Sequence, residues 1–151
     1  MKSIALVAHD ARKPDLVDWV DYNWKKLIAH RLVCTGTTGT NIQALLDQRA
    51  QGQPDHRIEL RKLKSGPLGG DQQLGAMIAE GEVQLFIFFW DPMTPQPHDV
   101  DVKALLRIAT MYNLPTATNR ATADFLISSP LFATDYQPAA PDVSDYVNRK
   151  L

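Results

Sequence analysis

The stretch Ser3-Ile4-Ala5-Leu6-Val7-Ala8-His9-Asp10 decides the fold class. Its first part is short and apolar, which is typical of a β-strand buried on both faces, and the polar pair His9 and Asp10 ends that strand. The residues that follow change period, because apolar side chains recur at helical spacing behind Pro14, a residue tolerated in a first helical turn. These side chains are Leu16, Trp19, Val20, Trp24, Leu27 and Ile28. This part of the chain is therefore predicted to be a strand followed by an amphipathic helix.

The same alternation of strand and helix continues along the sequence. Further strand patterns occupy residues 31–34, 57–63 and 84–90, and residues 116–117 are predicted to be the middle of a short strand. Further helix patterns occupy residues 38–50, 71–80, 100–112 and 121–128, with a last one near 143–150. Because there is no internal repeat and no linker, we predict one α/β domain over residues 1–151. Its expected architecture is a three-layer α/β/α sandwich with a mainly parallel five-stranded sheet and right-handed crossovers.

The composition excludes several classes of protein. The 151 residues are 44% hydrophobic and 22% charged, which is typical of a globular protein and not of a disordered or collagen-like chain. The formal net charge of -1 is too balanced for a protein that binds nucleic acid or an anionic membrane surface. The longest apolar run, residues 85–90, is too short to cross a bilayer. We therefore expect small-molecule or protein partners, with no nucleic acid and no membrane.

The cysteine content and the first residues predict the compartment. The single cysteine, Cys34, cannot form an internal disulfide or a thiolate-rich metal site, and its pattern predicts a buried thiol within a strand. The apolar run at residues 4–8 is too short for a signal peptide and lacks the small-residue cleavage site. Both observations favour a cytoplasmic protein.

Unusual residues follow four of the expected strands. In open parallel sheets, ligands bind beyond the carboxyl ends of the strands, and these ends meet at one rim. The segments in question are His9 and Asp10, residues 35–39, residues 65–71 and residues 92–101. We therefore predict that these loops converge on one ligand site.

Two of these loops have the features of a phosphate site. Glycine permits positive φ and close approach of a ligand, while the helix that follows presents unpaired N–H groups and the positive end of its dipole. Hydroxyl groups and one lysine add further donors, although helix caps and tight turns would explain the same residues. Neither loop matches G-x-x-x-x-G-K-[ST] or G-x-G-x-x-G, so nucleoside triphosphate and dinucleotide sites lack motif support. The candidates are Gly36, Gly39, Gly66, Gly69, Gly70, Thr35, Thr37, Thr38, Ser65 and Lys13.

Asp71 and His98 are candidates for acid–base chemistry. Asp71 begins a helix pattern, where it would act as an N-cap or, beside bound phosphate, as a base that removes a proton from the attached carbon chain. His98 precedes another helix pattern, near the positive helix end, where protonation is disfavoured. A neutral imidazole there could polarise a carbonyl, although capping or packing would also explain it. Asp99 and Asp101 occupy the same turn, where an acidic residue ordinarily serves to compensate the helix dipole.

His9 and Asp10 follow a buried strand directly, so their side chains are expected to face the ligand crevice. A divalent-metal site is an alternative for the acidic and histidine residues of the rim. We predict no metal, because no paired spacing such as H-E-x-x-H appears and the phosphate donors already supply electrostatic stabilisation. No serine lies in a G-x-S-x-G context, so a serine hydrolase has little support. The five residues that the metal alternative would use are His9, Asp10, Asp71, His98 and Asp101.

Four ordered motifs resemble those of the methylglyoxal synthase family, over nearly the whole chain. They are Ala8-His9-Asp10-Ala11-Arg12-Lys13, Thr35-Gly36-Thr37-Thr38-Gly39, Ser65-Gly66-Pro67-Leu68-Gly69-Gly70-Asp71-Gln72-Gln73, and Trp90-Asp91-Pro92 followed by Pro97-His98-Asp99-Val100-Asp101. The later segments Ala117-Thr118-Asn119 and Thr122-Ala123-Asp124-Phe125 also match.

The resemblance implies a Rossmann-like fold and a cytoplasmic lyase without a metal or other cofactor. Such an enzyme converts dihydroxyacetone phosphate into methylglyoxal and inorganic phosphate, is inhibited by phosphate and is usually a homohexamer. Asp71 would be the catalytic base, supported by Asp10 and Asp101, with His9 and His98 near the substrate oxygens. The phosphate-binding positions would be Lys13, Thr35, Gly36, Thr37, Thr38, Ser65 and Gly66.

The chain departs from the family pattern in two places. The segment around residues 51–64 resembles an insertion, and residues 51–56, with Gly52 and Pro54, are predicted to form a surface loop. Val100 replaces a proline that is common in the histidine motif, which affects a helix start and no catalytic side chain. A phosphate- or nucleotide-sensing regulatory domain of the same fold, without catalysis, is the competing class of function. The set Asp71, His98 and Asp101 favours the enzyme, because a domain that only binds would not need all three.

Overall fold

β1 (Ser3–Ala8) is the central strand of the molecule, and all of its residues are buried. In the computed structural model, which describes residues 1–51 and 58–149, it pairs with β2 (Arg31–Thr35) on one side and β4 (Leu85–Phe89) on the other. β3 (Glu59–Leu63) and β5 (Thr116–Ala117) form the edges, and all the pairs are parallel. The sheet therefore has five strands in the order β3-β2-β1-β4-β5, which confirms the predicted parallel sheet.

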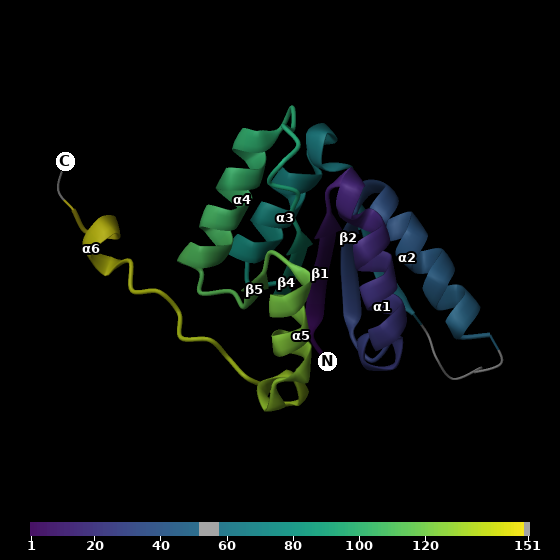
Figure 1. Ribbon diagram of the computed structural model, residues 1–151. Helices are drawn as coiled ribbons and strands as arrows, with labels where there is room; N and C mark the ends of the chain where they lie inside the picture. Colours follow the sequence, from purple (N-terminus) through teal and green to yellow (C-terminus); the bar gives the residue numbers. More distant parts are fainter. Residues whose placement is uncertain (52–57, 150–151) are drawn as a thin grey trace.

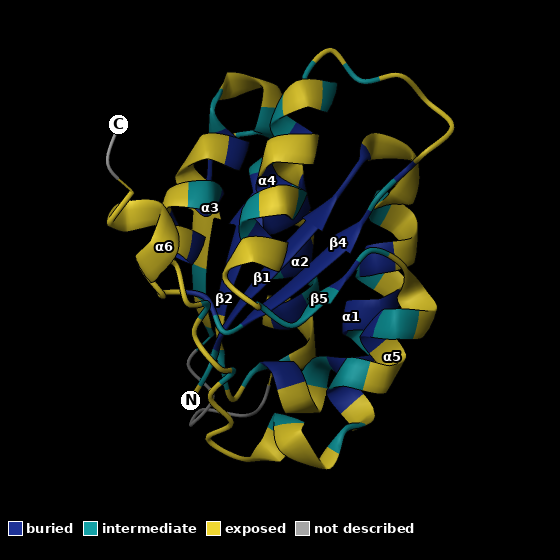
Figure 2. Cartoon of the chain, turned by 90° about the vertical axis from the view of Figure 1, so that its left-hand side faces the viewer, coloured by how far each residue is buried: buried dark blue, intermediate teal, exposed yellow. Residues whose placement is uncertain are grey.

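Helices cover both faces of this sheet, which confirms the three-layer prediction (Figure 1). Ile4 and Leu6 face a core formed with α1 (Lys13–Leu27), α2 (Gly36–Arg49) and α5 (Arg120–Ser128). Ala5 and Val7 face a core formed with α3 (Gly70–Ala79) and α4 (Asp99–Met111). Figure 2 shows the buried strands between helices whose outer surfaces are exposed. The alternation of side chains along β1 thus supplies both cores.

From β1 through β2 to β3, each new strand is added toward one edge of the sheet; after β3 the chain returns to the other side of β1, where β4 and then β5 are added. The connecting helices α1 and α2 lie on one face, and α3 and α4, which follow β3, lie on the other. Crossovers of one hand require this, because reversing the direction moves the connecting helix to the opposite face. As a result β1 and β4 are adjacent. The connection that follows β1 leads to β2 on one side of this pair, and the connection that follows β4 leads to β5 on the other side. A crevice beyond the carboxyl ends of such a strand pair is where parallel α/β sheets bind ligands.

Most element bounds differ from the predicted ones by one or two residues, as is usual at helix and strand ends. Four helices start before the expected residue, since α2, α3, α4 and α5 begin at Gly36, Gly70, Asp99 and Arg120. Of the two roles considered for Asp71, that of N-cap of α3 is excluded, because Gly69 occupies that position with φ 99° and Asp71 lies inside the first turn. Short 3-10 helices lie at Asp10–Arg12 (η1), Gly66–Leu68 (η2) and Pro130–Ala133 (η3).

Two predictions fall partly outside the described residues. The surface loop at 51–56 and the start of the strand predicted at 57–63 include residues 52–57, and the last helix was predicted to reach residue 150. Within the described residues, α6 is shorter than predicted and spans Ser144–Val147. Part of the supposed insertion, Glu59–Leu63, is the edge strand β3. Over residues 1–51 and 58–149, none of the helices combines the length and the apolar character that crossing a membrane requires.

Cys34 lies in β2 and is fully buried, as predicted. Burial raises the pKa of its thiol to about 12. The thiolate form is therefore disfavoured, and the side chain acts as a small apolar residue of the core.

Candidate active site

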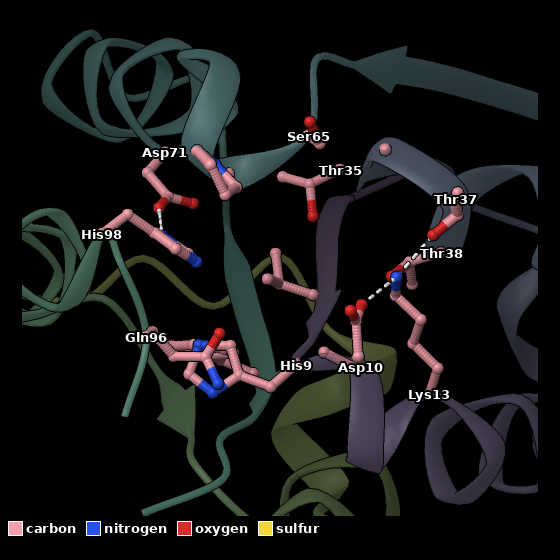
Figure 3. Close-up of a pocket in the computed structure, with 16 residues that line it drawn as sticks. His9, Asp10, Lys13, Thr35, Thr37, Thr38, Ser65, Asp71, Gln96 and His98 are labelled. Atoms are coloured by element: carbon pink, nitrogen blue, oxygen red, sulfur yellow. Dashed lines mark hydrogen bonds and ion pairs between the residues drawn. The ribbon is translucent and has the colours of Figure 1, made fainter. Parts of the chain in front are cut away.

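A pocket of about 370 Å³ lies beyond the carboxyl ends of β1, β2, β3 and β4. Its walls come from the loops that follow these strands, so the predicted convergence on one rim is confirmed. Figure 3 shows Asp71 and His98 on one side of this pocket and Lys13, Thr37 and Thr38 on the other. The predicted residues that line the pocket are His9, Asp10, Lys13, Thr35, Gly36, Thr37, Thr38, Ser65, Gly66, Asp71 and His98.

The first turn of α2 forms one wall of the pocket. Gly36 has φ +44°, and a β-carbon there would lie 2.9 Å from the Cβ of Ser65, so this turn accepts only glycine without rearrangement. Thr35 precedes the helix without a side-chain cap, and Thr38 is buried beneath the turn. The first N–H groups of a helix have no partner within the helix, so this wall is suited to an anion.

Lys13 supplies the positive charge of this wall. It begins α1, and its ammonium group donates to the Asp10 carboxylate at 2.5 Å and to the hydroxyl of Thr37. The hydrogen bond and the charge of Lys13 lower the pKa of Asp10 below its ordinary value. The Asp10 side chain is 96% exposed and that of Lys13 only 22% exposed, so the contact holds the lysine at the inner side of the pocket mouth.

Asp71 and His98 form the opposite wall. Asp71 lies in the first turn of α3 and His98 is the N-cap residue of α4, and the carboxylate Oδ2 lies 2.7 Å from the imidazole Nδ1. Both side chains are largely buried, with 5% of Asp71 and 10% of His98 exposed. A carboxylate next to an imidazole at the edge of a pocket is an arrangement suited to proton transfer.

Gly66 explains how this pair is packed. A β-carbon at position 66 would lie 2.7 Å from Cε1 of His98 and 3.0 Å from Oδ2 of Asp71. The absence of a side chain at Gly66 therefore leaves the space in which the two functional groups meet.

His9 lies between the two walls at the end of β1. Its Nδ1 accepts a hydrogen bond from the backbone N–H of Asp91 at 3.1 Å, and its ring lies edge-on to that of His98, with 5.8 Å between the ring centres. Burial, together with the neighbouring His98, lowers the pKa of His9 below its ordinary value. The imidazole is therefore neutral near pH 7, as a hydrogen-bonding group for a substrate oxygen should be.

Asp101 does not line the pocket, and neither do the candidate glycines Gly39, Gly69 and Gly70. Its half-buried carboxylate lies behind the pair, and the ligand atoms of Asp71, His98 and Asp101 all lie within 4.8 Å of one another. Three of the five residues of the metal alternative are therefore close enough to hold an ion. His98 Nδ1 is already engaged with Asp71, so metal binding through that atom would have to break the hydrogen bond.

Sequence reasoning missed several residues of the pocket. Val7, Ala8 and Phe88 line its floor as parts of buried strands, and Pro67 belongs to the loop that carries Gly66. Gln96 lies between two prolines in a loop assigned to the rim, yet no motif distinguished it from its neighbours. The prolines, which restrict the backbone on both sides, are the signal that could have indicated a fixed side chain there.

Comparison with known proteins identifies the family. The model of the family described as MGS-like domain matches residues 15–118. A methylglyoxal synthase of Maridesulfovibrio salexigens is 56% identical over 154 residues, an alignment that covers 100% of this chain and 98% of the relative. The chain belongs to the methylglyoxal synthase family. A second methylglyoxal synthase, from Pectobacterium atrosepticum, is 52% identical over 150 residues, covering 99% of this chain and 92% of the relative.

The fold of this methylglyoxal synthase family member also matches a solved structure. The crystal structure of methylglyoxal synthase from Elizabethkingia anophelis superimposes with a TM-score of 0.87 at 49% identity. The match covers 99% of this chain and 92% of that chain. The resemblance inferred from the motifs is therefore confirmed for both the family and the fold.

Proposed function

We propose that this protein is a methylglyoxal synthase, a carbon–oxygen lyase that converts dihydroxyacetone phosphate into methylglyoxal and inorganic phosphate. The observation that carries this proposal is the 2.7 Å contact between Asp71 and His98 directly across the pocket from a helix N-terminus suited to phosphate. The names of the relatives, which align over the full chain, support the same reaction.

The substrate phosphate binds against the first turn of α2. Backbone N–H groups and the helix dipole attract the anion, and the ammonium group of Lys13 adds a charge-assisted hydrogen bond. The hydroxyl groups lie on the same wall, and Gly66 lets the substrate approach the backbone. The groups proposed to hold the phosphate are Lys13, Thr35, Gly36, Thr37, Thr38, Ser65 and Gly66. The triose carbons then extend toward Asp71.

Catalysis begins when Asp71 takes a proton from the hydroxymethyl carbon. A positioned carboxylate base typically contributes about 10²- to 10⁴-fold to the rate. The imidazoles of His98 and His9 form hydrogen bonds with the two oxygens of the resulting enediol-type intermediate, and Asp10 and Asp101 support the arrangement. Asp10 acts by holding the ammonium group of Lys13 in place. Asp101 lies next to Asp71 and His98 and acts by supporting that pair.

Phosphate leaves from the enediol-type intermediate. The breaking C–O bond must lie roughly perpendicular to the enediol plane, because only this orientation aligns the orbitals for elimination. The phosphate wall meets this need by holding the anion away from Asp71 and by stabilising the charge that collects on it. The enol product becomes methylglyoxal by tautomerisation.

The proposal needs no metal and no organic cofactor, because protein donors supply the electrostatic stabilisation. Inorganic phosphate is a product and, by occupying the same wall, an inhibitor. We further propose that residues 1–151 act as one domain, that the protein works in the cytoplasm and that it assembles as a homohexamer.

A direct assay tests the reaction. Purified protein is incubated with dihydroxyacetone phosphate in buffer without added metal, and methylglyoxal is trapped and quantified together with released phosphate. Equal amounts of both products are expected. Binding of the substrate without any product would support a sensing domain in place of the enzyme and would refute the proposal.

A further inference from the structure

His98 has its proton on the nitrogen that faces Asp71. A carboxylate that acts as a base is ionised and can only accept hydrogen bonds, so the 2.7 Å contact requires His98 Nδ1 to donate. A neutral ring with its proton on Nδ1 carries a lone pair on Nε2. Figure 3 shows this second nitrogen turned away from Asp71, toward the middle of the pocket.

His9 has the opposite arrangement. A backbone N–H can only donate, so the 3.1 Å contact with Asp91 requires His9 Nδ1 to accept. The neutral ring therefore carries its proton on Nε2, and the lowered pKa of His9 keeps the second proton off. This buried Nε2 finds no hydrogen-bond partner among the described residues. Because burial of an N–H group without a partner is costly, the missing partner points to a ligand oxygen.

The turn after β4 sets this state of His9. Asp91 is only 7% exposed, and its carboxylate accepts a hydrogen bond from the backbone N–H of Met93 at 3.0 Å. This contact is a local turn in which the Asp91 side chain restrains the backbone that follows it, and so helps to hold the Asp91 N–H group in place. Asp91 is therefore a positioning residue for His9.

We propose that the two imidazoles meet the substrate with opposite polarity: His9 donates from Nε2 to the carbonyl oxygen, and His98 accepts at Nε2 from the hydroxyl group. The inference rests on the proposed function for the identity of the substrate and for the ionised state of Asp71. It assigns each ring to one oxygen of the triose, and therefore to a different step of the reaction.

The assignment gives each step its own group. When Asp71 takes the carbon-bound proton, negative charge collects on the former carbonyl oxygen, where the Nε2–H of His9 stabilises it. In the elimination, the hydroxyl proton passes to Nε2 of His98 and that oxygen becomes the aldehyde carbonyl. The carbon–carbon double bond shifts by one position, and the bond from carbon to the phosphate oxygen breaks. The protons held by Asp71 and His98 are then returned, one to the released phosphate and one to the enolate carbon, so that the atoms and charges balance.

Nitrogen NMR measures the polarity directly. In protein labelled with ¹⁵N-histidine, free of substrate and near neutral pH, His9 is expected to show a bare Nδ1 and a protonated Nε2, and His98 the reverse. His30 lies on a different part of the molecule, and its Nδ1 accepts from the backbone N–H of Lys2 at 3.2 Å, so it serves as an internal standard for the His9 pattern. A His98 ring protonated on Nε2, or a His9 ring protonated on Nδ1, would overturn the proposal.

Matched variants of His98 test the assigned step. An asparagine amide can replace Nδ1 of histidine but leaves nothing at Nε2, so His98→Asn keeps a donor to Asp71 and removes the acceptor. We expect methylglyoxal release to fall by about 10²-fold or more, and deuterium uptake from D₂O into recovered substrate to fall by less than about tenfold. Equal losses of exchange and elimination would refute the acceptor role.

The same substitution logic applies to His9. His9→Gln places an amide N–H near the position of Nε2, whereas His9→Asn does not. We expect His9→Asn to lose about 10²- to 10³-fold in both exchange and elimination, and His9→Gln to recover at least tenfold of that loss. Asp91→Asn keeps an oxygen for the Met93 N–H and should leave the His9 nitrogen shifts unchanged, while Asp91→Ala should move them. Equal activity of the two His9 variants would overturn the donor role.

The proposed function and the polarity of the two rings are tested by different results. If the unaltered protein makes no methylglyoxal, the proposed function is wrong whatever the NMR spectrum shows. If it makes methylglyoxal while the nitrogen shifts contradict the assignment, the function stands and the polarity of the two rings is wrong.

Discussion

The backbone of Gly66 lies so close to the ring of His98 that a β-carbon at position 66 would be 2.7 Å from His98 Cε1. Gly66→Ala should therefore push His98 and Asp71 apart and lower kcat by about 10²-fold. A misplacement of about 1 Å in a reacting group can reduce the rate by this factor. Steady-state kinetics with dihydroxyacetone phosphate measure the loss.

Gly75→Ala is the matched control for this substitution. A β-carbon at position 75, inside α3, would come no closer than 3.9 Å to Leu105, which is an ordinary contact. Alanine is favoured over glycine in a helix interior by about 1 kcal/mol, so this variant should keep its activity and gain stability in urea. Full activity in Gly66→Ala would contradict the proposed geometry.

Asp71→Asn should nearly abolish turnover. The amide cannot take the proton, so both methylglyoxal formation and hydrogen exchange at the reacting carbon should fall by about 10³-fold or more, while inorganic phosphate binds with nearly unchanged affinity. Asp99→Asn is the control, because Asp99 occupies the first turn of α4 but pairs with Lys103 at the surface. Normal exchange in Asp71→Asn would remove this residue from its proposed role.

Lys13→Met should weaken phosphate binding. The variant loses a charge-assisted hydrogen bond to the anion, and we expect the Kd for inorganic phosphate and the KM for substrate to rise by about tenfold or more. Calorimetry measures the first and kinetics the second. Lys103→Met alters a side chain that is 73% exposed and whose ammonium group pairs with Asp99, and this variant should change neither constant. An equal effect of both variants would mean that Lys13 acts only through net charge.

The free energy of unfolding should fall as the pH falls below about 6.5. The pKa values of His9 and His30 are lowered from 6.5, chiefly by burial, so the unfolded chain binds these protons at a higher pH than the folded chain. The loss of stability starts near pH 6.5, the pKa of a histidine in the unfolded chain. It is complete once the pH lies below the pKa values that His9 and His30 have in the folded protein. Urea unfolding at several pH values measures the slope, which His30→Gln should reduce. A stability that rises toward acid would contradict this account.

Chelators should leave the reaction rate unchanged. Asp71, His98 and Asp101 lie close enough to bind an ion, but the proposed chemistry uses His98 Nδ1 as a donor to Asp71. Protein treated with EDTA and dialysed should retain its kcat, and added zinc should inhibit by competing for these atoms. Loss of activity on chelation with recovery on metal addition would favour the metal alternative.

The sequence predicted the layers of the fold because each depends on a local pattern. Apolar runs such as Ser3–Ala8 mark buried strands, and spacing such as Leu16 to Leu27 marks a helix face. The strand order is different, because the position of β1 between β2 and β4 depends on contacts between distant segments. Nothing in any one strand encodes its neighbours.

The candidate site shows the same limit. Motifs and strand ends predicted which residues would gather at the rim. Most of those residues line one pocket, whereas Gly39, Gly69 and Gly70 do not and Asp101 lies next to Asp71 and His98 without lining it. The hydrogen bond between Asp71 and His98 joins residues 27 positions apart. The sequence placed each residue at the start of its own helix and did not predict the contact between them. Asp71 was open to an N-cap interpretation because the left-handed conformation of Gly69, which actually precedes the helix, is not visible in the sequence.

The change of helix face after β3 divides the site along the chain. Lysine and threonine donors come from the segments before that change. After it, Asp71 comes from the first turn of α3 and His98 from the N-cap position of α4. The two sets meet at the loop after β3, where the Gly36 N–H donates to the Lys64 carbonyl oxygen and Gly66 lies against Asp71 and His98. Substitutions of Asp71 and His98 themselves leave the lysine and threonine side chains in place. A descendant that lost both reactive side chains would still capture phosphate esters and release them intact, and so this architecture lets a lineage exchange turnover for storage or signalling by very few mutations.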